Sequence, residues 1–96
     1  MPLSNEDVMF GAAYRVVFER VNPDACNDQR ARIAIACKIT MMAEWVKLQP
    51  EPVAQAYTRA FGEIEKRADA VLENNLRHQQ QIEAYGVIAK PPDIPA

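Results

Sequence analysis

The chain has 96 residues, with 11 basic and 13 acidic residues giving a formal net charge of −2 at pH 7. This length suffices for one small domain, and the hydrophobic fraction of 49% lies in the globular range. Charges are spread over both halves, so no polybasic arm or acidic tail favours attraction to nucleic acid or to an anionic membrane.

Localisation follows from two further features of the sequence. No apolar run approaches the roughly 18–20 residues of a membrane span. The start of the chain, MPLSNEDVMF, is acidic and does not have the pattern of a signal peptide. We therefore expect a cytoplasmic protein, or one that acts within a particle assembled in the cytoplasm, with no membrane partner.

The first helix is expected over residues 5–21. Ser4 has the pattern of an N-cap, and the acidic residues that follow suit the positive end of the helix dipole. Apolar residues recur at i, i+4 spacing along this segment and form a wide apolar face. The helix should end near Asn22, because Pro23 disfavours the helical conformation in the residue before it.

The second helix is expected over residues 28–48, with Asn22 or Asn27 as its N-cap, and it carries two adjacent apolar stripes. The first stripe consists of Ile35, Ile39, Met42 and Val46, and the second consists of Ala34, Cys37, Met41, Trp45 and Leu48. Since apolar residues cover most of the circumference, we expect a central helix that is contacted on two or more sides.

The two cysteines, Cys26 and Cys37, are too few for a disulfide framework. Cys37 lies in the middle of the second helix among Ala and Ile, and we expect it to be a buried, reduced thiol. Cys26 falls in the turn before that helix, where we expect it to be more exposed. No basic neighbour with a clear geometry indicates a reactive thiol at Cys26.

The third helix is expected over residues 52–85, with Pro52 in its first turn and Gly86 as its terminator. At 1.5 Å per residue it would be about 50 Å long, against about 25 and 33 Å for the other two helices. It should therefore project beyond its partners by several turns. Residues 87–96, VIAKPPDIPA, are expected to form an extended Pro-rich tail.

The third helix also carries a repeat with alternating spacings of four and three, as in the seam of a coiled coil. Its members are Tyr57, Phe61, Ile64, Ala68, Val71, Asn75, His78, Ile82 and Tyr85. The first five suit an intramolecular core, whereas the last four should lie beyond the ends of the shorter helices. Leu72, Leu76 and Gln79 form a competing stripe beside this seam.

Two interpretations of the projecting end are open. A simply solvated extension is supported by the i, i+4 pair of Glu73 and Arg77. A protein interface is favoured because a lone helical extension is marginal in water unless its apolar face is covered. The interface predicted on this basis consists of Val71, Leu72, Asn75, Leu76, His78, Gln79, Ile82, Tyr85, Val87 and Ile88.

His78 is the only histidine of the chain. In this seam we interpret it as a hydrogen-bonded interface residue and not as a metal ligand or a base. If it were buried across a symmetry axis, an oligomer held by this segment should loosen below a pH of about 6, near the ordinary pKa of histidine. Light scattering between pH 8 and pH 5 tests this expectation.

Several kinds of chemistry have no counterpart in the sequence. Two cysteines and one distant histidine do not supply the four close ligands of a zinc site. No glycine-rich phosphate-binding motif occurs, and Ser4, the only serine, is explained as a helix cap. We therefore expect a protein that is not an enzyme and that uses no cofactor or metal.

The first two helices and their connection also resemble, in outline, the arrangement of a helix-turn-helix. Gln29, Arg30 and Arg32 are the candidate nucleic-acid contacts, because these residue types at the start of a second helix read bases or phosphates. The apolar remainder of that helix and the negative net charge argue against an exposed position in a DNA groove. Nucleic acid is therefore not the expected partner.

The sequence as a whole predicts an all-α protein: a three-helix antiparallel arrangement in which the long third helix projects and the extended tail follows. Residues 1–86 should form the helical domain. The expected function is that of a non-enzymatic assembly or adaptor subunit that binds copies of itself or a larger protein complex, such as a virus particle or a secretion machine. The alternative is a small regulatory binder, either a DNA-binding protein or a protein inhibitor.

Overall fold

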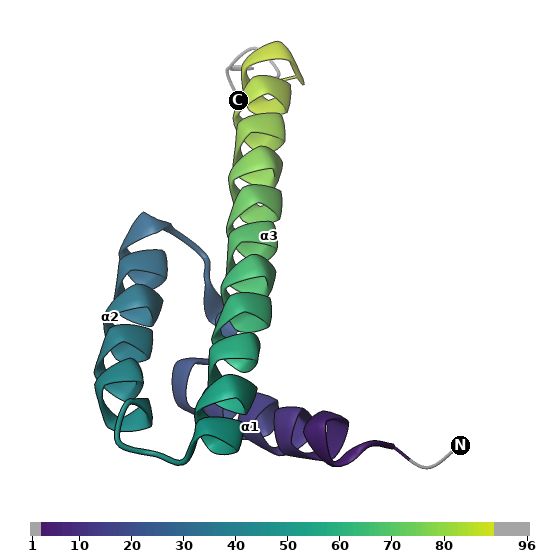
Figure 1. Ribbon diagram of the computed structural model, residues 1–96. Coiled ribbons are helices and arrows are strands. Elements are labelled where there is room, and N and C mark those ends of the chain that lie inside the picture. Colours follow the sequence, from purple (N-terminus) through teal and green to yellow (C-terminus); the bar gives the residue numbers. More distant parts are fainter. Residues whose placement is uncertain (1–2, 90–96) are drawn as a thin grey trace.

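The computed structural model describes the backbone of residues 3–89 and the side chains of residues 3–83 (Figure 1). The described chain forms three α-helices and one 3-10 turn: α1 (Asn5–Val21), η1 (Pro23–Ala25), α2 (Gln29–Val46) and α3 (Glu51–Ala89). Within these residues there is no β-strand. The prediction of an all-α protein with three helices is confirmed.

The direction of α1 relative to α3 follows from two side-chain contacts. Asp7 at the start of α1 pairs with Arg59 near the start of α3, at 3.5 Å. About two turns further along both helices, Arg67 of α3 donates to the hydroxyl of Tyr14 of α1 at 3.4 Å. The two helices therefore run in the same general direction, and α1 crosses the lower half of α3 (Figure 1).

The second helix runs in the opposite direction. Arg32 near the start of α2 contacts Asp69 of α3, whereas Trp45 near its end stacks edge-on against Tyr57, closer to the start of α3, with 5.4 Å between ring centroids. The helices thus alternate in direction along the chain, which confirms the antiparallel arrangement that the sequence predicted.

Helix α1 is capped at its start by a side chain and at its end by a backbone N–H group. The hydroxyl of Ser4 accepts from the backbone N–H of Asp7 at 3.1 Å, as the sequence predicted. At the other end Asn22 adopts a left-handed conformation with a φ of 46°, and its N–H donates to the carbonyl of Phe18. Asparagine tolerates this conformation better than most residues, so it ends the helix just before Pro23.

Helix α2 begins at a different residue from the one expected. The side chain of Asp28, and not that of an asparagine, accepts from the backbone N–H of Ala31 at 2.8 Å. The helix ends at Val46, before Leu48, because Lys47 to Gln49 already form the turn that leads to Pro50. Both bounds lie within two residues of the prediction.

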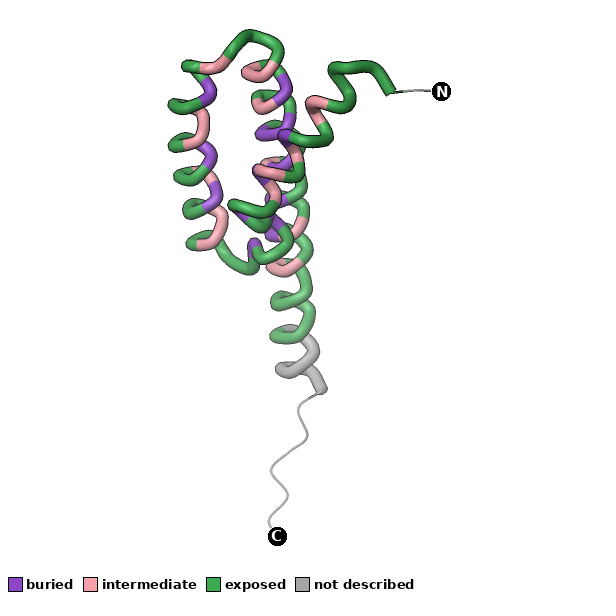
Figure 2. The backbone as a smooth tube through the Cα atoms, turned by 90° about the horizontal axis from the view of Figure 1, so that it is seen from below, coloured by how far each residue is buried: buried purple, intermediate pink, exposed green. Residues whose placement is uncertain are grey.

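The core lies where the three helices and η1 meet, and Figure 2 shows its buried positions on the facing sides of the helices. It consists of Ala13, Val17, Val21, Cys26, Ile35, Ile39, Val46, Ala56, Ala60, Phe61, Ile64, Ala68 and Leu72. Ile64 and Val17 are completely buried. The alanines of α3 allow its neighbours to approach closely, and each large apolar side chain contributes about 1.5–3 kcal/mol on burial.

A polar cluster joins α1, η1 and α3 at the edge of this core. Arg67 donates to both carboxylate oxygens of Asp24, at 2.6 and 2.9 Å, and its guanidinium lies 5.0 Å from the ring centre of Phe18. The hydrogen bonds from Arg67 lower the pKa of Asp24 below its ordinary value. This bidentate contact fixes the 3-10 turn on the surface of the long helix.

Helix α3 continues further than the sequence predicted. Its 39 residues correspond to about 58 Å, and it passes through Gly86 to end at Ala89. The prediction of a stop at Gly86, and of an extended conformation from residue 87, is therefore wrong for residues 87–89. One glycine weakens a helix by only about 1 kcal/mol, so α3 can continue through Gly86. Pro91, in contrast, disfavours the helical conformation in the residue before it. The rest of the tail, residues 90–96, lies outside the described residues.

Candidate protein-binding surfaces

The end of α3 projects beyond the other helices, as the length difference predicted. Among the side chains of α3 that the structure describes, Leu72 is the last that is buried and Leu76 the last apolar one that is half-buried, and every residue from 77 to 83 is exposed. We call residues 77–89 the projecting end. Figure 1 shows it leaving the three-helix body without a neighbouring segment among the residues that are described, and Figure 2 shows the same for its described part, residues 77–83.

Asn75 corrects the predicted point at which intramolecular packing stops. Its side-chain amide donates to the carbonyl of Cys26 at 3.4 Å and to the side chain of Asn27 at 3.2 Å. This contact comes from the connection between α1 and α2 and not from the helices themselves. The expectation that Asn75 belongs to the projecting part of α3 is therefore wrong. Asn75 has a structural partner in its own chain.

The ten residues of the predicted interface accordingly divide into three groups. Val71, Leu72, Asn75 and Leu76 pack wholly or partly within the chain. His78, Gln79 and Ile82 are exposed, and Ile82 retains 58% of its exposed area. Tyr85, Val87 and Ile88 belong to the helix, but their side chains lie outside the described residues.

A second apolar surface lies on the exposed side of α2, and one of its members, Trp45, also contacts Tyr57 of α3. We call it the outer face; its members are Ile33, Ala34, Cys37, Met41, Trp45 and Leu48, and all of them are exposed. Ile33 is 61% exposed, Met41 73% and Leu48 82%. An exposed apolar row of this kind on one helix is a candidate contact surface.

This surface corrects two expectations about α2. The helix was expected to be contacted on two or more sides, but the described residues bury only the side that carries Ile35, Ile39 and Val46, and the second stripe is exposed. The expected positions of the cysteines are also reversed. Cys37 is exposed on the outer face, whereas Cys26 is fully buried beside η1, and burial raises the pKa of its thiol.

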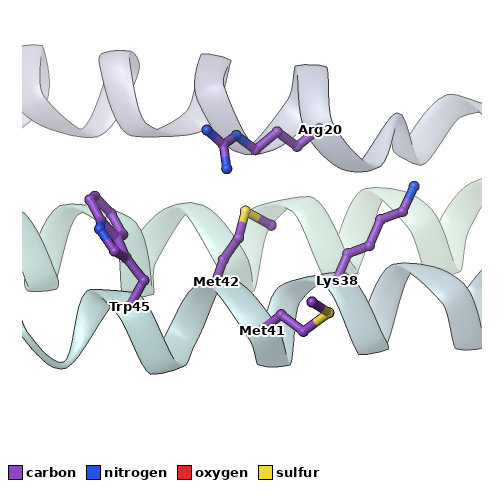
Figure 3. Close-up of a pocket in the computed structure, with 5 residues that line it drawn as sticks. All are labelled: Arg20, Lys38, Met41, Met42 and Trp45. Carbon is purple, nitrogen blue, oxygen red and sulfur yellow. The ribbon is translucent and has the colours of Figure 1, made fainter.

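A groove between α1 and α2 adjoins the outer face. It comprises a hollow of about 400 Å³ and a neighbouring one of about 210 Å³. Figure 3 shows Arg20 of α1 reaching towards Met42 and Trp45 of α2, with Lys38 and Met41 further along. Apolar side chains thus line the groove and two cations border it. Met41 and Trp45 belong to both surfaces, which therefore form one continuous apolar region.

The three candidate nucleic-acid contacts are not equivalent in the structure. Gln29 and Arg30 are exposed. Arg32 is only 18% exposed and donates to Glu65 and Asp69 of α3. These hydrogen bonds stabilise the charged guanidinium and raise the pKa of Arg32 further above its ordinary value. Arg32 therefore connects α2 to α3 through its Nε and one of its Nη atoms.

Within the described part of the chain, the histidine, cysteine and acidic side chains form no cluster of three or more that could hold a metal ion. None of the described helices combines the length and the apolar character needed to cross a membrane. No protein-family model, curated protein or solved structure matches this chain, so no relative assigns a role to either surface.

Sequence reasoning found the projecting end but missed the outer face of α2. The signal for it was present, since Ala34, Cys37, Met41, Trp45 and Leu48 form a regular stripe in the sequence. That stripe was assigned to contacts within the chain. A sequence pattern reports that a face is suited to burial, but not which molecule buries it.

Proposed function

We propose that this protein is a non-catalytic assembly or adaptor subunit that docks on a larger protein complex, or on further copies of itself, through its projecting end. The observation that supports this proposal is the exposure of α3 over residues 77–83, with Ile82 on its surface. A helix that leaves its domain in this way presents side chains from all directions to a partner.

The energetics of the projecting end favour a bound state. Helical segments of about 12–15 residues are marginal in water without tertiary contacts. The described polar support is one i, i+4 ion pair between Arg77 and Glu73, at 2.8 Å and well exposed, which contributes roughly 0.3–0.5 kcal/mol. Packing against another protein would supply the missing burial of Ile82.

The kind of complex that this proposal implies is an intracellular assembly, for example a virus particle or a secretion machine. In such assemblies small helical subunits join larger components. The alternative is a small regulatory protein that inhibits an enzyme by docking the same helix. The two differ in solution mass, because an inhibitor acts as a monomer and an assembly subunit forms a stable larger species. DNA binding loses support because Arg32 is committed to Glu65 and Asp69.

The test places a photo-crosslinking amino acid at Ile82 of the full-length protein, expressed in the cells of its source organism. Lys66 is the matched control position, because it also lies on α3 and its side chain is 79% exposed, but on the three-helix body. We expect a covalent adduct of defined mass at position 82 and none at position 66. Mass spectrometry of the adduct then identifies the partner.

The result that contradicts the proposal is the same background labelling at both positions. A defined adduct at position 66 alone would also contradict it, because the body and not the projecting end would then carry the contact. The adduct's mass distinguishes a second copy of the chain from a different protein.

A further inference from the structure

The outer face of α2 has a property beyond its exposure: two of its large apolar residues are placed symmetrically about Cys37. Ile33 lies four residues before Cys37 and Met41 lies four residues after it, so apolar side chains flank the centre on both sides. All three fall within a narrow angular range, because residues four apart differ by about 40° around a helix.

Two charged residues on this face are also placed symmetrically about Cys37, and their charges have opposite signs. Arg30 lies seven residues before Cys37 and Glu44 lies seven residues after it, and both are exposed. Two heptads place them on the same line along the helix, about 21 Å apart. Among the ion pairs of the described residues none involves Arg30, and Glu44 makes only an exposed i, i+3 contact with Lys47 at 2.9 Å.

Such an arrangement is complementary to itself in the antiparallel direction. If two copies of α2 pack about a twofold axis through Cys37, each residue n positions before Cys37 meets the residue n positions after it in the other copy. Ile33 then meets Met41, and Arg30 meets Glu44, twice each. In a parallel pairing, by contrast, Arg30 would face Arg30 and Glu44 would face Glu44.

We propose that the outer face of α2 is the interface of a homodimer, with the α2 helices antiparallel and Cys37 at the twofold axis. The charge complementarity of Arg30 and Glu44 assigns the face to a second copy of this chain and not to an unrelated protein. This interface is separate from the projecting end of α3, so it does not depend on what that end binds.

The first test is the mass of the full-length protein by sedimentation over a range of concentrations. We expect a dimer of twice the 10.8 kDa chain mass. Arg30→Glu and Glu44→Arg should each weaken dimerisation at least tenfold, because each places like charges opposite one another. The double variant with both changes restores opposite charges and should return the dissociation constant to within a few-fold of that of the wild type.

A matched control is Lys66→Glu, which reverses an exposed charge on α3 away from this face and should leave the dissociation constant unchanged. Circular dichroism confirms that each variant is folded. A protein that stays monomeric at every concentration overturns the proposal and assigns the outer face to a different partner. Single reversals without effect, or a double variant that remains weak, overturn it as well, since they exclude this register.

A second test uses the native cysteines with a short bis-maleimide crosslinker. Cys37 of the two copies should be joined into a covalent dimer, whereas the buried Cys26 should remain unmodified in the folded protein. Peptide mapping by mass spectrometry identifies the linked residue. A dimeric sample that gives no Cys37 to Cys37 link overturns the proposed axis. Met41→Glu should abolish both the link and the dimer, and retention of either overturns the interface.

Discussion

The two sides of α2 are built from similar residues but have opposite surroundings. One side carries Ile39 in the core, and the other carries Ile33 in solvent, six residues earlier on the same helix. The side towards the core is explained by α3 and α1. The side away from it has no such explanation in the part of the chain that the structure describes. Apolar patterning in a sequence therefore identifies faces that are suited to burial. Only the structure shows which of these faces the chain buries against itself.

The largest expected difference between the two sides is in stability. Ile39→Ala should lower the free energy of unfolding by about 3 kcal/mol, because it leaves a cavity in the core. Ile33→Ala should change the stability of the monomer by no more than about 0.5 kcal/mol, because its side chain is exposed there. Urea denaturation at low protein concentration measures both. Equal losses in the dilute limit would contradict the assignment of inner and outer sides.

The fold was predictable from the sequence where local signals were strong. Ser4 as a cap and Pro23 as a boundary gave the bounds of α1, because both act through their immediate neighbours. The end of α3 was not predictable from Gly86, because glycine permits a helix to end without forcing it to. The reach of α3 beyond its partners followed from helix lengths alone, whereas the contact of Asn75 with the α1–α2 connection required the tertiary structure.

Arginines on the two sides of α2 provide the next comparison. Arg32→Ala should lower the free energy of unfolding by about 1.5 kcal/mol, because two charge-assisted hydrogen bonds to α3 are lost and two carboxylates are left without their partner. Arg30→Ala should leave the monomer's stability within about 0.5 kcal/mol of the wild type. Thermal unfolding of both variants at the same low concentration measures the difference. An equal effect of the two changes would show that Arg32 does not connect α2 to α3.

A smaller difference is expected between two neighbouring asparagines of α3. Asn75 donates to the connection between α1 and α2, whereas Asn74 is exposed. Replacing either by alanine brings the same gain in helix propensity, so the comparison isolates the hydrogen bonds. Asn75→Ala should be less stable than Asn74→Ala by about 1 kcal/mol. If the two variants unfold at the same denaturant concentration, the contact of Asn75 makes no net contribution.

The sequence predicted the position of the projecting end of α3 but not the exposure of the outer face of α2. Ile82 and His78 were correctly expected to lie beyond the shorter helices, because those helices are too short to reach them. Cys37 and Met41 were expected to be covered, because a helix that is apolar around most of its circumference is usually central. In a fold of three helices, however, α2 has too few neighbours to be surrounded. The number of neighbours depends on the fold of the chain and cannot be read from the apolar stripe of one helix.

The smallest expected effect concerns the cluster of Arg67 and Asp24, which lies at the edge of the core and is open to solvent. The guanidinium lowers the pKa of Asp24 below 3.8, its ordinary value. When the pKa of a carboxylate is lower in the folded than in the unfolded state, the carboxylate stabilises the folded state. This contribution is complete above the pKa of the unfolded state and is lost as the pH falls through the pKa of the folded state. The free energy of unfolding should therefore decline below a pH of about 4 more steeply in the wild type than in Asp24→Asn.

Arg67→Gln provides the matched variant for this measurement, because it removes the cation and leaves the carboxylate. It should flatten the acid limb of the stability curve as much as Asp24→Asn does, and the double variant should flatten it no further, since the two single changes remove the same interaction. Urea denaturation between pH 2 and pH 6 measures all four proteins. Additive flattening in the double variant would show that the two side chains act independently, and that the contact of Arg67 with Asp24 does not contribute to the acid limb.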